Sequence, residues 1–247
     1  MTVLVTRPGQ QGLSLCQQLE KVGVSSIHHP LITFRAGDEL PLLPDNINNV
    51  DIVIAVSQHA VTFAAQIMNQ AEKSWPSTIS YLAVGQKTAH VLSKTTQQQV
   101  HYPNISDSEH LLNLPPLLDI KNKRVLILRG NGGRELIYDT LSARGANVEY
   151  IEAYQRQNRA FNANVHIPRW QEEQVNKLII TSSGQLNHFI EMMNSTQLNW
   201  VFKLTLYVPS ERIAIEAHQL GFVSVVNTGS ASNKDLLAIL WPNQQDD

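Results

Sequence analysis

The chain has little of several features that would assign it to a particular class of protein. Its single cysteine, Cys16, excludes a disulfide framework and indicates a reducing compartment. No apolar run approaches the roughly 18 residues of a membrane span, and no signal peptide precedes Met1. The formal net charge of -2 gives no general attraction for nucleic acid or acidic membranes. We therefore expect a soluble cytoplasmic protein that binds neither nucleic acid nor a membrane.

The common motifs for metals, nucleotides and nucleophilic catalysis are also missing. His28 and His29 are adjacent on a predicted strand and would point to opposite faces, while the other histidines are scattered singly. The glycines of segment 130–133 lack the spacing of a dinucleotide-binding loop, and no P-loop lysine follows them. No G-x-S-x-G elbow occurs. We expect no metal and no cofactor.

What the sequence does contain is a repeated α/β unit. In segment 123–156 an apolar run predicts a buried strand, and a polar turn, an amphipathic helix and a second strand follow. Segment 3–30 repeats this order, so that Arg7 corresponds to Arg129. Both copies therefore place an arginine where a strand ends, which is where open α/β sheets bind ligands.

The rest of the chain continues the alternation of strands and helices. Further strands are expected at 51–56, 81–84, 100–102, 178–181, 205–208 and 223–226, with helices at 60–69, 86–93 and 211–220. Ser106 and Ser232 are expected to cap two more helices. The pattern amounts to about ten strands in two sets of five, mostly followed by helices, which predicts parallel sheets covered on both faces.

The order of the repeats leaves two domain arrangements open. Two consecutive domains would meet near residue 120. Alternatively, the extended segments Leu31–Phe34 and Glu152–Gln155 both cross between domains, and the middle of the chain forms an inserted domain. The crossings would then follow the second strand of each repeat, at matching places.

Small hydroxyl side chains recur at the predicted strand ends: Thr6, Ser57, Thr88, Ser182, Ser183 and Ser210. Each lies at or beside a predicted helix start, where serine and threonine commonly cap helices. Together they would also suit carboxylates or phosphates, because helix N-termini carry partial positive charge. Tyr154, in the second crossing, is either a packing residue or a proton donor.

Ordered motifs along nearly the whole chain resemble those of the uroporphyrinogen-III synthase family. They are Val3-Leu4-Val5-Thr6-Arg7-Pro8, Pro30-Leu31-Ile32, Ser57 after an apolar strand, Ala83-Val84-Gly85-Gln86-Lys87-Thr88-Ala89, Val125-Leu126-Ile127-Leu128-Arg129-Gly130 with Gly133-Arg134, Glu152-Ala153-Tyr154 and Thr181-Ser182-Ser183. Each motif is loose on its own, and their order carries the resemblance.

The resemblance implies two Rossmann/flavodoxin-like α/β domains with parallel sheets, joined by a two-stranded β-ladder. The discontinuous domain would comprise residues 1–34 and 157–247, and the inserted domain residues 35–152. The linkers would lie near 30–36 and 152–157. The active site would lie in the inter-domain cleft.

The resemblance also implies a lyase of tetrapyrrole and haem biosynthesis that works as a monomer without a cofactor. Members of the family cyclise hydroxymethylbilane, a linear tetrapyrrole with eight carboxylates, to uroporphyrinogen III. Water is lost, and ring D is inverted through a spiro intermediate. Because the substrate also closes unaided without inversion, the enzyme must hold one conformer. A transient contact with the preceding enzyme of the pathway would fit an unstable substrate.

On this basis Tyr154 is expected to donate a proton to the leaving hydroxyl, and Thr88 to position that end of the substrate. The expected substrate-binding residues are Thr6, Arg7, Ser57, Gln58, Gly85, Arg129, Gly130, Ser182, Ser183, Ser210 and Arg212. Arg212 stands where the family often has a threonine, so either Ser210 or Arg212 could meet the substrate.

Two other functions fit parts of the pattern. One is a non-enzymatic two-domain binder of a small anionic ligand that closes about a hinge. The other is a flavodoxin-like flavin binder, whose colour on purification would identify it.

Overall fold

The computed structural model describes residues 1–241, which form two compact α/β units. Unit 1 consists of Met1–Thr33 together with the chain from Gln157 onward, and unit 2 consists of Phe34–Arg156. Apart from the β3–β8 pair, neighbouring strands of both sheets run parallel. The predicted α/β class with two parallel sheets is therefore confirmed.

Unit 2 contains a six-stranded sheet in the order β3-β8-β7-β4-β5-β6. Its strands are β3 (Ile32–Ala36), β4 (Ile52–Ala55), β5 (Ser80–Ala83), β6 (Val100–His101), β7 (Arg124–Gly130) and β8 (Asn147–Asn158). Its α-helices are α2 (Leu43–Asn46), α3 (Gln58–Gln70), α4 (Gln86–Thr96), α5 (Ser108–Leu111) and α6 (Leu136–Ala143), and its 3-10 turns are η1 (Leu40–Leu42), η2 (Ile47–Asn49) and η3 (Pro115–Leu117).

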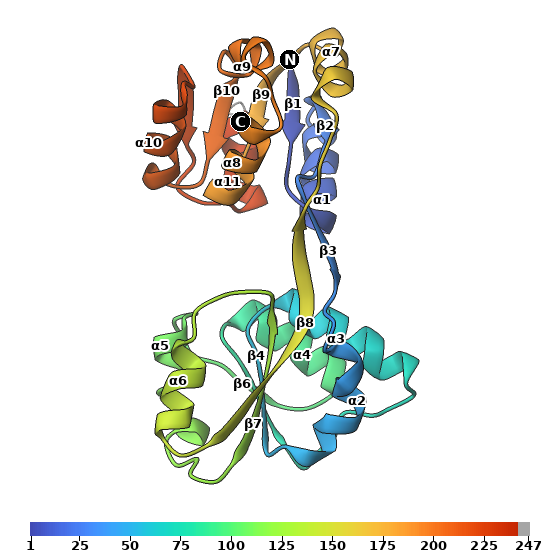
Figure 1. Cartoon of the computed structure of the whole chain (residues 1–247), viewed down its shortest axis with the longest axis vertical. Coiled ribbons are helices and arrows are strands. Elements are labelled where there is room, and N and C mark those ends of the chain that lie inside the picture. The colour runs from blue at the N-terminus through green and yellow to red at the C-terminus, as the bar shows by residue number, and fades with distance from the viewer. Residues whose placement is uncertain (242–247) are drawn as a thin grey trace, which may run out of the picture. The chain divides into compact units, whose positions relative to one another are not determined.

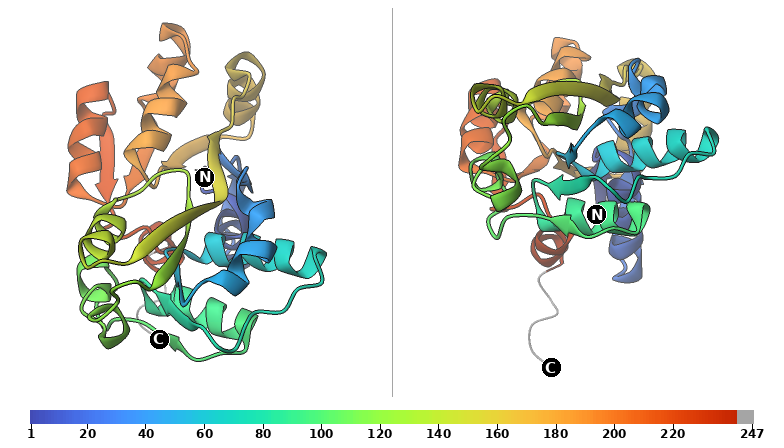
Figure 2. Two further views of the ribbon diagram at one scale, coloured as in Figure 1. Left: turned by 60° about the horizontal axis from the view of Figure 1, so that its bottom comes forward. Right: turned by 90° about the horizontal axis from the view of Figure 1, so that it is seen from below.

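Alternation along the central strands separates two hydrophobic layers in unit 2. In β4, Val53 joins the layer under α2, α3 and α4, whereas Ile52 and Ile54 join the layer under α5 and α6. Figure 1 shows these two sets of helices on opposite sides of the sheet. In the left view of Figure 2, the yellow-green α6 and the cyan α3 are again separated by the sheet. Both faces are buried, which explains the continuous apolar runs of β4 and β7.

Unit 1 contains a five-stranded sheet in the order β11-β10-β9-β1-β2. Its strands are β1 (Thr2–Val5), β2 (Ser25–His28), β9 (Val175–Ile179), β10 (Thr205–Val208) and β11 (Ser224–Asn227). Its helices are α1 (Gly9–Lys21), α7 (Ala163–Glu172), α8 (Ser183–Glu191), α9 (Ser195–Val201), α10 (Glu211–Leu220) and α11 (Asn233–Leu240). Helices α1 and α11 cover one face, and α7 to α10 supply the apolar side chains of the other.

Local predictions agree with the structure at some positions and differ at others. Ser106 does not cap α5, because the adjacent Asp107 is the N-cap and its carboxylate accepts a hydrogen bond from the amide N of His110 at 2.7 Å. Ser232 does cap α11, as predicted. Helix α7 was not predicted, and Pro168 lies inside it. The extended segments expected as crossings, Leu31–Phe34 and Glu152–Gln155, overlap β3 and β8, which are neighbours in one sheet.

Among residues 1–241, no helix is long and apolar enough to cross a membrane.

Candidate active site

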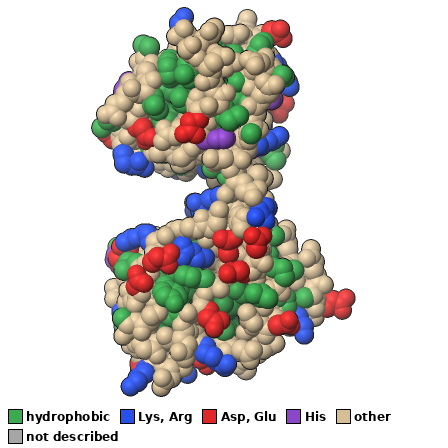
Figure 3. All heavy atoms as spheres, in the orientation of Figure 1, with side chains coloured by type: hydrophobic (Ala, Val, Ile, Leu, Met, Phe, Trp, Pro, Cys, Tyr) green, Lys and Arg blue, Asp and Glu red, His purple; other side chains and the backbone are tan. Residues whose placement is uncertain are grey.

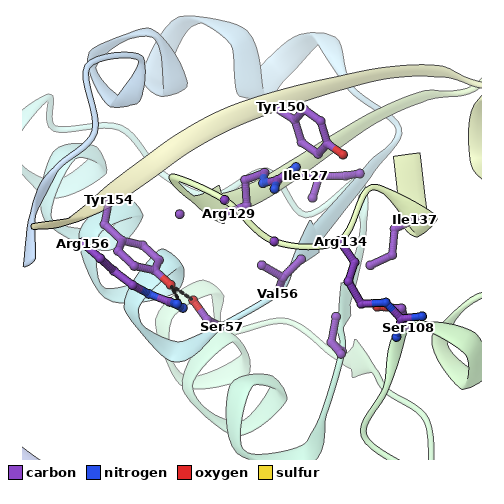
Figure 4. A pocket seen from close by; sticks show the side chains of 14 residues that line it. Val56, Ser57, Ser108, Ile127, Arg129, Arg134, Ile137, Tyr150, Tyr154 and Arg156 are labelled. Carbon is purple, nitrogen blue, oxygen red and sulfur yellow. Dashed lines mark hydrogen bonds between the residues drawn. The ribbon is translucent and has the colours of Figure 1, made fainter. Parts of the chain in front are cut away.

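A pocket of about 210 Å³ opens in unit 2 at the carboxyl ends of β4 and β7, next to β8 (Figure 4). Its polar lining includes Ser57, Ser108, Arg129, Arg134, Tyr150, Tyr154 and Arg156, and its apolar lining includes Val56, Val84, Ile127 and Ile137. Parallel neighbouring strands end at the same edge, so residues that follow separate strands are brought together here. The result is a partly apolar hollow that contains three arginines.

Tyr154 lies on β8 and is only 1% exposed. Its phenol oxygen accepts a hydrogen bond from Nη2 of Arg156 at 3.1 Å and a longer one from Oγ of Ser57 at 3.3 Å. Both contacts are drawn in Figure 4. Ser57 also caps α3, since its Oγ accepts a hydrogen bond from the amide N of Ala60 at 3.2 Å. The cap therefore fixes the serine against the phenol.

Aromatic side chains pack against the ring of Tyr154. Phe63 stacks on it with ring centroids 6.1 Å apart, and Phe34 meets it edge-on at 5.7 Å. His59 lies 5.6 Å from the same ring and stacks on Phe34 at 4.1 Å. Burial, and secondarily the positive charge of Arg156, lowers the pKa of His59 below its ordinary value. The imidazole is therefore neutral near neutral pH and is not a competing acid.

Arg129 occupies the opposite side of the pocket. Its Nη1 donates a hydrogen bond to Oε1 of Glu135 at 2.8 Å, and its guanidinium lies 4.5 Å from the ring centroid of Tyr150. The hydroxyl of Tyr150 donates to Oε2 of the same glutamate at 2.5 Å. Burial opposes the charge of Arg129, but the contacts with Glu135 and Tyr150 outweigh it and raise the pKa of the arginine. Burial, followed by the hydrogen bond to the carboxylate of Glu135, raises the pKa of Tyr150. The hydrogen bonds that Glu135 accepts from Tyr150 and Arg129 lower the pKa of the glutamate.

Arg134 forms a two-pronged ion pair with Glu109, with N–O distances of 2.5 and 3.2 Å. Both side chains are exposed, and the pair links the glycine loop after β7 to helix α5. Exposed pairs of this kind contribute little to stability. Figure 3 shows that arginine or lysine side chains and acidic side chains lie next to one another on the visible surface of unit 2.

The structure brings together four of the predicted site residues of unit 2, namely Ser57, Arg129, Gly130 and Tyr154. Three others lie outside the lining of this pocket: Gln58, Gly85 and Thr88. Gln58 is exposed at the start of α3, Gly85 is the N-cap of α4, and Thr88 is buried in the first turn of α4.

In unit 1 the first two predicted residues point into the fold. Thr6 is fully buried and donates a hydrogen bond to the carbonyl of Ile179 at 2.6 Å. Arg7 is 8% exposed, and it donates to Gln11 at 2.6 Å and to Asn233. Burial lowers the pKa of Arg7. Both side chains therefore hold neighbouring elements of unit 1 together.

The remaining predicted residues of unit 1 lie where β9 and β10 end. Ser182 caps α8, and the hydroxyl of Ser183 accepts a hydrogen bond from Nη1 of Arg212 at 2.9 Å. Ser210 is the N-cap of α10, and within the described residues its hydroxyl makes no capping hydrogen bond. Arg212 and Ser183 thus form a contact that sequence spacing did not indicate.

Sequence reasoning missed four polar residues of the pocket lining, Ser108, Arg134, Tyr150 and Arg156. It also missed Glu135, which forms an ion pair with Arg129. Arg156 was detectable, because it follows Tyr154 by two residues on an extended segment and alternation places both on one face. Glu135 and Tyr150 gave no comparable signal. Their contact with Arg129 depends on how β7, the glycine loop and β8 come together.

Among residues 1–241, no group of three or more histidine, cysteine, aspartate or glutamate side chains is arranged to hold a metal ion. The pocket instead offers hydroxyl groups and guanidinium groups, which bind carboxylates well.

Comparison with known proteins identifies the family. Residues 14–238 match the family described as uroporphyrinogen-III synthase HemD. The uroporphyrinogen-III synthase of Escherichia coli (strain K12) is 40% identical over 245 residues, which is 97% of this chain and 100% of that protein. The uroporphyrinogen-III synthase of Proteus mirabilis is 41% identical over 182 residues, covering 72% of this chain and 92% of the relative.

Solved structures share the fold at much lower identity. The uroporphyrinogen-III synthetase of Helicobacter pylori 26695 superposes with a TM-score of 0.60 at 15% identity and covers 98% of each chain. A mutant uroporphyrinogen III synthase from the extremely thermophilic bacterium Thermus thermophilus gives a TM-score of 0.59 at 15% identity, with 100% of both chains covered. The sequence matches and the shared fold agree, and this chain belongs to the uroporphyrinogen-III synthase family.

Proposed function

We propose that this chain is a hydro-lyase with uroporphyrinogen-III synthase activity, converting hydroxymethylbilane to uroporphyrinogen III. Beyond family membership, one observation carries the proposal: the phenol of Tyr154 lies in a pocket lined by Arg129, Arg134 and Arg156. This arrangement combines a proton donor with cations that suit a substrate bearing eight carboxylates.

The arginines of the pocket are suited to the acetate and propionate side chains of the substrate. Arg129 and Arg134 are paired with Glu135 and Glu109, which are both largely exposed. A substrate carboxylate can take the place of an exposed glutamate without leaving a buried charge unpaired. Binding in unit 2 would thus exchange internal ion pairs for pairs with the substrate.

The reaction would start with transfer of the Tyr154 proton to the leaving hydroxyl of the substrate. The C–O bond breaks, water leaves, and an azafulvene cation forms, which then closes through a spiro intermediate with inversion of ring D. The substrate also closes without inversion, so the main contribution of the protein is to hold one conformer. The substrate supplies the carbon nucleophile that attacks the cation, so neither a nucleophile of the protein nor a cofactor takes part in this scheme.

Predicted residues outside the pocket have supporting roles in the proposal. Thr88 would position the hydroxymethyl end of the substrate, and Gln58 and Gly85 would bind carboxylates from the starts of α3 and α4. At the strand ends of unit 1, carboxylate binding would fall to Ser182, Ser183, Ser210 and Arg212. Thr6 and Arg7 would act by holding that edge in place, since their side chains are engaged within unit 1.

We also propose a cytoplasmic monomer that receives its unstable substrate from the preceding enzyme of the pathway. The free Cys16 fits a reducing compartment. Sedimentation of the purified protein, alone and mixed with the enzyme that makes hydroxymethylbilane, would test both the monomer and the contact.

The deciding experiment is incubation with freshly made hydroxymethylbilane, followed by oxidation and separation of the I and III porphyrin isomers. We expect the III isomer to predominate with the protein and the I isomer to predominate without it. An unchanged isomer ratio would reject the activity and favour a non-enzymatic binder of a small anion.

A further inference from the structure

The two hydrogen bonds received by Tyr154 leave its own proton unused. Arg156 can only donate hydrogen bonds, and Oγ of Ser57 already accepts one from the amide of Ala60. The serine hydroxyl keeps its own proton for donation, and it donates to the phenol oxygen, 3.3 Å away. With both neighbours donating, the proton of Tyr154 stays available for a substrate hydroxyl, because the phenol belongs to the pocket lining (Figure 4).

Arg156 differs from the other two arginines that line the pocket. Arg129 and Arg134 each form an ion pair with a glutamate. Within residues 1–241, Arg156 forms no ion pair, and its guanidinium lies 5.8 Å from the ring centroid of Tyr154. Its charge is therefore not neutralised by a carboxylate and is directed at the phenol.

We propose that Arg156 is a positioning residue that acts through Tyr154, by holding the phenol oxygen and stabilising the phenolate left after proton donation. The proposal rests on the proposed function and adds to it a second residue for the proton-transfer step. Hydrogen bonds from a charged donor are stronger than neutral ones and become stronger still when negative charge develops on the acceptor. The effect is therefore larger in the transition state than in the ground state, which is the condition for catalysis.

Protons and charges balance over the proton-transfer step and the ring closure that follows it. The Tyr154 O–H bond breaks, the proton passes to the substrate hydroxyl, and the C–O bond breaks with its electron pair leaving as water. The phenolate then carries one negative charge beside Arg156, while the substrate carries one positive charge. When the cation has closed and rearranged, it loses one proton, which returns to the phenolate oxygen. No oxidant, reductant or other reactant is consumed.

The kinetic test compares Arg156→Met and Arg156→Lys with the unchanged protein. We expect Arg156→Met to lower kcat for the III isomer by about 100- to 1,000-fold, by analogy with loss of one transition-state hydrogen-bond donor. KM should change much less. The alkaline limb of the profile of kcat against pH should move to higher pH, because Arg156 no longer stabilises the phenolate of Tyr154. Arg156→Lys should restore part of kcat, since it keeps the charge and loses the planar fork.

The matched control is Arg169→Met, which removes an exposed arginine of α7 that is paired with Glu173. It should leave kcat, KM and the pH profile as they are. A rise in KM at unchanged kcat and pH profile in Arg156→Met would make Arg156 a carboxylate ligand and would overturn the proposal. Equal losses in the methionine and lysine variants, with no movement of the pH profile, would also overturn it.

A titration without substrate separates this inference from the proposed function. Tyrosinate absorbance is followed against pH for the unchanged protein, for Tyr154→Phe and for Arg156→Met. The ionisation step that is missing in Tyr154→Phe should occur at higher pH in Arg156→Met. If that step does not move while the unchanged protein produces the III isomer, the inference fails and the activity stands. If the step moves but no III isomer forms, the activity fails and the effect of Arg156 on the phenol stands.

Discussion

A Cβ atom added at Gly130 would lie 2.6 Å from Cζ of Tyr154. The glycine ends β7, and Gly130 pairs with Tyr154 of β8 in the sheet register. Such a distance is far inside van der Waals contact, so the absence of a side chain at Gly130 is what leaves room for the phenol ring beside this strand. The glycine contributes space for the proposed proton donor.

Gly130→Ala should therefore move the ring of Tyr154 and lower activity. We expect kcat to fall by about 10- to 100-fold, because a misplacement of about 1 Å in an active site can cost that much. Steady-state assay of III isomer formation measures the effect.

Gly184→Ala is the matched control, because among the described residues nothing lies within 4 Å of the added Cβ and the position is helical. It should keep its activity and gain up to about 1 kcal/mol of helix stability. Equal activity in both variants would contradict the role given to Gly130.

Tyr154→Phe should lower turnover strongly while the fold is kept. The ring contacts with Phe34 and Phe63 remain, so the free energy of unfolding should drop by only about 1 kcal/mol for the lost hydrogen bonds. Loss of a general acid should reduce kcat by about 100- to 10,000-fold. Parallel assays of kcat and of urea unfolding measure the two effects. Full activity in this variant would remove Tyr154 from the chemistry.

Substitutions of Arg129 and of Glu135 should have opposite effects on substrate binding. Arg129→Met removes a carboxylate ligand and should raise KM about tenfold or more, as expected for loss of a charged hydrogen bond. Glu135→Gln removes the carboxylate that competes for Arg129, so KM should fall. Initial rates over a range of substrate concentrations measure both changes. A rise in KM for Glu135→Gln would show instead that the glutamate is needed to hold Arg129 in position.

Acid should destabilise unit 1 through His29. This side chain is 8% exposed and packs against Trp170 and His166, with ring centroids 5.0 and 4.7 Å away. Burial, followed by the nearby charges of His166, Arg159 and His28, lowers the pKa of His29 from its ordinary value of 6.5 to about 4. The unfolded chain therefore binds the proton more readily than the folded protein does.

Stability from a neutral His29 is complete above about pH 6.5 and is lost as the pH falls toward 4. The expected loss over this interval is about 2 kcal/mol, after allowance for partial exposure to solvent. Urea unfolding followed by tryptophan fluorescence at several pH values measures it. His29→Phe should flatten the dependence of the free energy of unfolding on pH. If this dependence has the same slope in the variant as in the original protein, the assignment to His29 is contradicted.

Much of the organisation could be predicted from local patterns. Apolar runs such as those of β4 and β7 indicate strands buried on both faces, and the repeat of Arg7 in Arg129 indicates two related units. Ser57, Arg129, Gly130 and Tyr154 were identified because they follow strand ends or lie on a crossing segment. They meet in one pocket because β4, β7 and β8 are neighbours in one sheet. The α7 helix escaped prediction, since Pro168 interrupts the expected pattern of a helix interior.

The amino-acid sequence by itself determined the α/β alternation, the doubled unit and the family, because these depend on periodicity and on motifs that are local along the chain. Only the tertiary structure decided what each polar side chain does. It directed Arg7 to Asn233, joined Tyr150 to Glu135, and brought Ser57 against Tyr154. The physical reason is that each of these contacts joins residues on separate elements of the fold, and local spacing along the chain does not encode which elements become neighbours.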